Sequence, residues 1–331
     1  DLHSFPTRRS SDLHIALGVF SQADIALSDA WVLNLGLRYS EEEKSIESAR
    51  FVPAPLVGTS LCNFDTETCT PDFVNSDNWD DVTPKVGVQW KGSDDLQAYA
   101  YWAKGFRSGG YNLRNTSNLN PATGQFVNPP GPTEPEDVNA YEIGVKVDWP
   151  GNRVRTNIAV YYNDITDMQR ELNLPGPAGV EQVIRNTADA TIQGFELEAQ
   201  AQLGGGFLLM GSYGYTDGEY DRILFDISGD GVINQTDLGL KIPRLAENTY
   251  GVGLMHEARL GGAELSTRIN FFHRDESAYT DNNLGVLHEA DMLDASIGLA
   301  LMEGKLGLAL FGRNLLDEVT EGNDKIGRAH V

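Results

Sequence analysis

The strongest constraint on the fold is an alternation of apolar and polar side chains that recurs along the chain. Around Tyr141, the apolar Tyr141, Ile143 and Val145 alternate with the polar Glu142 and Lys146. Successive side chains of a β-strand point to opposite faces, so each such segment predicts a strand with one apolar and one polar face. The same pattern recurs in residues 31–39, 154–162, 195–203, 265–271, 293–301 and 306–310. One alternating strand also fits a soluble sandwich, whereas about a dozen in series are typical of a transmembrane β-barrel.

The connections between these segments are alternately short and long. Short turns rich in Gly, Asp, Asn and Ser, which favour hairpins, are expected at residues 28–30, 93–95, 150–152, 204–206, 260–262 and 303–304. Long loops are expected at residues 46–82, 108–137, 170–183, 221–246 and 275–287. Long connections therefore fall on every second junction, which predicts a barrel with short periplasmic turns and long outer loops.

Three tryptophans lie close to the predicted short turns. Trp31, Trp90 and Trp149 are each within a few residues of such a turn. An aromatic girdle at the membrane interface would place them there. Burial in an ordinary core is the alternative for any one of them, and their shared position favours the girdle.

Composition excludes several other classes. The 331 residues contain no apolar run of the roughly 18 residues that a membrane-spanning helix requires. A hydrophobic content of 40% would ordinarily indicate a soluble protein, but half of each barrel strand is polar. The net charge of −23 argues against nucleic acid or another polyanion as a partner.

Two cysteines, Cys62 and Cys69, lie in the first long loop. In an oxidising compartment they would close a small disulfide ring, and two free buried thiols are the alternative.

A series of short motifs lies at the edges of the predicted strands, at residues 80–87, 101–112, 134–136, 141–144, 162–164, 186–188, 194–198 and 312–318. In this order they resemble the TonB-dependent outer-membrane receptors of the iron-complex type. The resemblance extends over residues 14–325. Residues 1–13 and 326–331 instead resemble translations of sequencing adapters, and we expect both ends to be artefacts of sequence assembly.

This resemblance implies a barrel of about 22 strands around an N-terminal plug. It also implies import of a ferric siderophore or a similar scarce nutrient, driven by the TonB complex. The expected partners are outer-membrane lipid, the TonB complex and a metal-chelate or other small-molecule ligand, in the outer membrane of a Gram-negative bacterium. We expect residues 14–325 to be the C-terminal part of the barrel, about half of it, without the plug, the TonB box or the last strand.

One loop fits the spacing of a twelve-residue calcium loop. Its expected ligands, the last at position twelve, are Asp226, Ser228, Asp230, the Val232 carbonyl, Asn234 and Asp237. Gly231 stands at position six, where such a loop turns sharply, and the pattern is similar to the calcium loops of dockerins. The predicted role is structural ordering of the loop by calcium. An Asp- and Gly-rich surface loop without metal is the alternative.

No arrangement of residues indicates an enzyme. The histidines lack ligand spacing, and the triple glycine at residues 204–206 is expected to be a turn. Arg107 and Tyr111 follow a predicted strand and are candidate contacts for an anionic metal chelate, because guanidinium groups suit carboxylate and phosphate. A role in ordering the loop is their alternative.

Two other functions stay open from the sequence. A passive porin-like channel would have the same strand pattern without a plug. A secreted soluble β module with a calcium-dependent docking loop would lack a lipid-facing band.

Overall fold

The computed structural model describes residues 7–51, 71–112, 123, 128–176 and 179–319. These residues form strands and one short helix, in the chain order β1 (Thr7–Ala26), β2 (Trp31–Phe51), β3 (Phe73–Ser93), β4 (Leu96–Arg107), β5 (Glu136–Asp148), β6 (Val154–Gly176), β7 (Gly179–Gly204), β8 (Phe207–Ile223), α1 (Gln235–Leu238), β9 (Asn248–Leu260), β10 (Ala263–Arg274), β11 (Ser277–Ala278), β12 (Val286–Leu287), β13 (Ala290–Leu301) and β14 (Leu306–Gly312).

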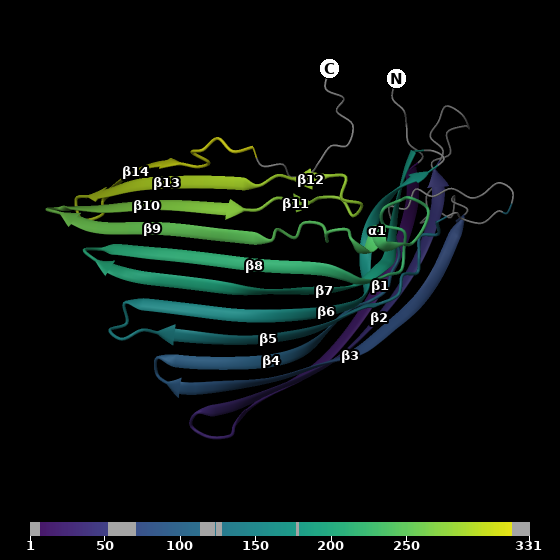
Figure 1. Cartoon of the computed structure of the whole chain (residues 1–331), viewed down its shortest axis with the longest axis horizontal. Coiled ribbons are helices and arrows are strands. Elements are labelled where there is room, and N and C mark those ends of the chain that lie inside the picture. Colours follow the sequence, from purple (N-terminus) through teal and green to yellow (C-terminus); the bar gives the residue numbers. More distant parts are fainter. Residues whose placement is uncertain (1–6, 52–70, 113–122, 124–127, 177–178, 320–331) are drawn as a thin grey trace, which may run out of the picture.

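Twelve of the strands form one antiparallel sheet in the order β1-β2-β3-β4-β5-β6-β7-β8-β9-β10-β13-β14. Each strand pairs with its neighbour in the chain, except that the small β11–β12 hairpin is inserted between β10 and β13. The sheet is curved, and β1 and β14 form its two edges (Figure 1). The predicted all-β, antiparallel fold is confirmed. The sheet has twelve strands, whereas a complete barrel of this type has about 22.

The sheet has two different ends. Short turns join the strands at one end, on the left of Figure 1, and we call this the turn end. The opposite end, the loop end, carries α1, the β11–β12 hairpin and the long connections (Figure 1). This segregation agrees with the predicted alternation of short and long connections.

The two faces of the sheet differ in the same way as the sequence pattern. On one face, here called the apolar face, Ile143, Val160 and Val252 are 58%, 50% and 50% exposed. The opposite, polar face carries Glu142 and Glu198, from positions that alternate with these in the strands. A folded protein in water rarely leaves so many large apolar side chains uncovered, so the apolar face is suited to an apolar medium.

Glycines allow tyrosine rings to lie flat against the polar face. A Cβ at Gly144 would come within 2.4 Å of the Tyr99 ring, on the strand directly opposite. A Cβ at Gly194 would similarly lie 2.6 Å from the Tyr161 hydroxyl. These cross-strand pairs need glycine for the close approach of the ring to the backbone.

Two hairpins are longer than the sequence pattern predicts. β2 and β3 have 21 residues each, and β6 and β7 have 23 and 26, whereas β4 has 12. A membrane crossing needs about 9–11 strand residues, so these hairpins continue well past that length at the loop end.

The expected loop at residues 170–183 is wrong, because β6 reaches Gly176 and β7 starts at Gly179. The loop expected at residues 46–82 is likewise shorter, since β2 ends at Phe51 and β3 starts at Phe73.

The described ranges hold one helix, α1, which has four residues. No helix in those ranges is long and apolar enough to cross a membrane. Residues 7–13 continue β1 and pair with β2, and their assignment to an adapter translation stays a prediction. Cys62 and Cys69 lie outside the described residues, as do residues 326–331.

Candidate functional site

The connection between β4 and β5 is fastened to β2 and β3 at the loop end. The Lys44 ammonium group donates to the Ser108 hydroxyl at 2.5 Å and to the Gly109 carbonyl at 2.8 Å. It also forms an ion pair with Glu42 at 3.1 Å and lies 5.6 Å from the centre of the Trp79 ring. A Cβ at Gly109 would come within 2.3 Å of the Trp79 indole nitrogen, so the loop packs directly against β3.

The same connection is fastened on its other side to β6 and β7. The Gln169 amide donates to the carbonyls of Ser108 at 3.0 Å and Glu134 at 2.8 Å. The Asn186 amide donates to the carbonyls of Glu134 at 2.9 Å and Asp167 at 2.7 Å. The β4–β5 connection therefore bridges the two long hairpins, and we call it the bridging loop (residues 108–112 and 128–135).

The structure places Arg107 at the end of β4 and Tyr111 in this loop, in different surroundings. The Arg107 side chain is 58% exposed, with a loose ion pair to Glu136 at 3.9 Å. The Tyr111 ring packs edge-on against Phe73 and Trp79, with centroids 6.3 and 6.1 Å away. Its hydroxyl is buried and has no hydrogen-bond partner among the described residues. Tyr111 thus anchors the loop, and a contact of either residue with a ligand stays a prediction.

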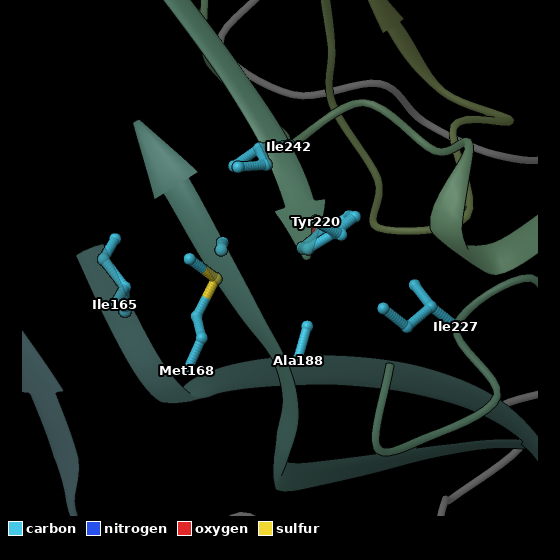
Figure 2. Close-up of a cluster of buried hydrophobic side chains, with 7 residues drawn as sticks. Ile165, Met168, Ala188, Tyr220, Ile227 and Ile242 are labelled. Carbon is cyan, nitrogen blue, oxygen red and sulfur yellow. The ribbon is translucent and has the colours of Figure 1, made fainter. Parts of the chain in front are cut away.

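The connection between β8 and β9 folds back over the sheet and forms a hydrophobic cluster with it. Ile227 and Ile242 of this loop pack against Ile165, Met168 and Tyr220 of the sheet (Figure 2). Ile227 and Ile242 are each 5% exposed, and Tyr220 is 3% exposed. Burial of these side chains holds the loop against the ends of β6, β7 and β8.

The predicted calcium loop lies within this connection. The carboxylate of Asp226 accepts from the backbone N–H groups of Gly229 at 2.8 Å and Gly231 at 2.7 Å. Asp230 accepts from the Val232 N–H at 2.9 Å and the Asn234 amide at 2.9 Å. The loop is thus already ordered by hydrogen bonds to its own backbone.

Asp237, expected at position twelve, is the centre of that order. It is 0% exposed and accepts from the N–H groups of Ile227 at 2.9 Å, Ser228 at 2.7 Å and Asn234 at 2.9 Å. No three His, Cys, Asp or Glu side chains within the described ranges are arranged to hold a metal ion. Calcium binding by Asp226, Ser228, Asp230, Val232, Asn234 and Asp237 stays a prediction.

The polar face holds a hollow of about 410 Å³ that extends from β1 to β5. The hydroxyls of Tyr99 and Tyr101 donate to the two carboxylate oxygens of Glu142 at 2.7 and 2.9 Å. The ammonium groups of Lys85 and Lys146 lie over the rings of Tyr101 and Tyr99, at 4.6 and 5.8 Å. This wall is polar and hydrogen-bonded, as expected for a surface that meets water.

Three charged residues at the loop end were missed by the sequence reasoning: Arg170, Arg185 and Asp281. Arg170 and Arg185 are directly opposite in the β6–β7 register, and Asp281 forms an ion pair with Arg170 at 2.6 Å. If residues 170–183 are predicted as two paired strands instead of a loop, the antiparallel pairing places Arg170 opposite Arg185.

The chain belongs to the family described as TonB dependent receptor-like, beta-barrel, whose model matches residues 4–315. This agrees with the resemblance seen in the sequence.

The chain is also similar to individual relatives in sequence and to a solved structure in fold. The metal-pseudopaline receptor CntO of Pseudomonas aeruginosa is 23% identical over 260 residues, which cover 77% of this chain and 30% of that protein. The probable TonB-dependent siderophore receptor PiuA of Acinetobacter baumannii is 21% identical over 207 residues, which cover 62% and 24%. The chain thus spans less than a third of the length of these curated relatives. The crystal structure of the ferric yersiniabactin uptake receptor FyuA from Yersinia pestis has a TM-score of 0.73 and 20% identity, with 96% of this chain and 43% of that one covered.

Proposed function

We propose that this chain is part of a TonB-dependent receptor that imports a ferric siderophore or a similar scarce nutrient across the outer membrane of a Gram-negative bacterium. The observation that carries the proposal is membership of the receptor family, whose model matches residues 4–315. The names of the relatives support the choice of ligand, since CntO is a metal-pseudopaline receptor and PiuA a probable siderophore receptor.

The geometry supports a membrane location and a role in transport. The exposed apolar face suits lipid, and the opposite polar face suits a water-filled interior. At the loop end the bridging loop and the β8–β9 connection are both packed against the strands, which suits a surface that captures a ligand. The TonB complex would act on the whole receptor, and outer-membrane lipid would cover the apolar face.

The test is iron uptake by a Gram-negative host that carries the gene of the full-length receptor and lacks its own siderophore receptors. We expect uptake of radiolabelled iron with at least one of a panel of ferric siderophores, and loss of that uptake when TonB is deleted. Uptake that persists without TonB would indicate a passive channel instead. Recovery of the protein from the aqueous phase of a detergent partition would indicate a soluble β module. A receptor that imports another scarce nutrient would give no iron uptake but would still partition into detergent.

A further inference from the structure

Two arginines face each other across the long hairpin at the loop end. Arg170 of β6 and Arg185 of β7 are directly opposed in the antiparallel register. Directly opposed residues have Cβ atoms about 5 Å apart and side chains on the same face of the sheet. A guanidinium group keeps its charge in a protein, so the hairpin carries two positive charges close together at the loop end.

Only one of the two arginines has an anionic partner within the described residues. Arg170 forms an ion pair with Asp281 at 2.6 Å, and their side chains are 27% and 14% exposed. Arg185 is half-buried and donates only to the backbone carbonyls of Pro129 and Ile184, at 3.1–3.5 Å. Arg185 lies well beyond the part of β7 that a membrane crossing needs. Burial is the one cause that lowers the pKa of its guanidinium group. One positive charge of the pair is therefore left without a counter-ion in the described structure.

The anion beside Arg170 comes from a separate element. Asp281 lies in the connection between β11 and β12. Asn283 fastens this connection to the β8–β9 loop, because its side chain accepts from the Lys241 N–H at 2.7 Å and donates to the Lys241 carbonyl at 2.9 Å. Asp281 thus reaches Arg170 from a loop that is held in place independently of their ion pair.

A further donor without a partner lies beside this ion pair. The Tyr220 side chain is 3% exposed, and its hydroxyl has no hydrogen-bond partner among the described residues. It is close enough to interact electrostatically with both Arg170 and Asp281. A buried hydroxyl with no partner is costly, and an acceptor that enters beside it would remove that cost.

We propose that Arg170 and Arg185 form a binding site for an anionic group, a carboxylate or a phosphate, and that Asp281 is an internal competitor that this group displaces from Arg170. Planar guanidinium groups bind both kinds of anion through paired hydrogen bonds. The inference deepens the proposed function and rests on it, because it assigns a negative charge to the part of the ligand that meets the loop end.

The test is isothermal titration calorimetry of the full-length protein in detergent, with tricarballylate as the carboxylate probe and inorganic phosphate as the second probe. We expect Asp281→Asn to bind the preferred probe about tenfold more tightly, because the competitor is gone, and Arg185→Gln to bind it about tenfold more weakly. Arg259→Gln is the matched control, since Arg259 lies at the turn end with a side chain that is 84% exposed, and it should leave the affinity unchanged. The probe that binds more tightly identifies the anionic group.

A second variant separates competition from simple loosening of the loop. Asn283→Ala releases the β11–β12 connection from Lys241 but keeps the Asp281 carboxylate, so it should not reproduce the tighter binding of Asp281→Asn. If it does, the role of Asp281 as a competitor is overturned. If wild-type protein binds neither probe, or if Arg185→Gln binds as wild type does, the anion site is overturned. Because calorimetry needs no TonB, intact anion binding in a protein that fails to import would count against the proposed function alone.

Discussion

At the residue scale, Asp237 shows how one carboxylate can order a whole loop. Its burial opposes ionisation, but the N–H groups of Ser228, Asn234 and Ile227 outweigh this effect, so the pKa of Asp237 is lowered below its ordinary value of 3.8. A group whose folded-state pKa is lowered stabilises the fold at pH values above its unfolded pKa. That stabilisation is lost as the pH falls below 3.8 and through the folded-state value.

We therefore expect Asp237→Asn to weaken the β8–β9 loop at neutral pH. The loss of charged acceptors should lower the local opening free energy by about 1–3 kcal/mol. Hydrogen exchange of the peptide covering residues 224–246, measured by mass spectrometry, should be faster in the variant at pH 7. The difference from wild type should shrink as the pH is lowered from 3.8 through the folded-state pKa of Asp237, because wild-type Asp237 then also becomes protonated. A difference that stays constant while the wild-type carboxyl is titrated would contradict this explanation.

Calcium should act on the same loop if the predicted ligands bind it. Calcium titration of the full-length protein should slow hydrogen exchange in residues 224–246, and Asp226→Ala should abolish that effect because it removes the ligand at position one. Magnesium at equal concentration is the control, since it prefers a smaller, strictly octahedral site. Exchange that calcium leaves unchanged would support the alternative of a metal-free loop.

The sequence predicts candidate site residues where the pattern is local in the chain. Asp226 and Asp237 are candidates because the spacing of a calcium loop is local, and calcium binding by them stays a prediction. Arg107 is a candidate because guanidinium groups suit carboxylate and phosphate, and the structure places it at the end of β4 with a side chain that is 58% exposed. Arg170 and Asp281 are 111 residues apart in the chain, so only the tertiary structure could bring them together.

At the element scale, the strands depend on how side chains of neighbouring strands share space. Gly144 lies beneath the Tyr99 ring, and the Tyr99 hydroxyl donates to the Glu142 carboxylate. Because glycine has no side chain, a tyrosine ring can lie close to the backbone of the neighbouring strand, where its hydroxyl forms a cross-strand hydrogen bond.

A side chain at Gly144 should therefore displace Tyr99. We expect Gly144→Val to destabilise the protein by about 1–3 kcal/mol, the usual cost of overpacking. The measurement is the urea midpoint of unfolding in detergent. Gly307→Ala is the control, because nothing lies within 4 Å of a Cβ built there. Tyr99→Ala combined with Gly144→Val should restore part of the loss, and a double variant no more stable than Gly144→Val would contradict the steric cause.

The sequence pattern predicted strands well where one face is apolar and failed where neither is. The segment around Tyr141 alternates clearly and forms β5. The outer part of β2 instead reads Ser-Glu-Glu-Glu-Lys-Ser, and that of β6 includes Gln169 and Arg170. These parts rise beyond the length of a membrane crossing, so no lipid selects apolar side chains there and the alternation disappears.

At the scale of the whole molecule, the sheet has two edge strands, β1 and β14. β14 exposes Leu308, Leu310 and Phe311, which are 55%, 73% and 70% exposed, along an edge that pairs with no further strand in the described residues. An open apolar edge strand promotes pairing with other chains.

We expect the 331-residue chain alone to associate in detergent-free buffer through these edges. Leu310→Lys should reduce the associated fraction measured by analytical ultracentrifugation, because a charge on an edge strand opposes pairing. Leu284→Lys is the control, since Leu284 is 79% exposed but lies in the β11–β12 connection, away from the edge. If Leu284→Lys reduces association as much as Leu310→Lys does, association depends on the total exposed apolar surface and not on the edge strand.

The bridging loop has a mechanical consequence for the rim of the molecule. It is tied to Lys44 on one hairpin and to Gln169 and Asn186 on the other, with β4 and β5 between them. The bridging loop therefore couples the outer parts of the two long hairpins, so we expect a displacement of one to displace the other. Loss of these hydrogen bonds would let the two hairpins move independently.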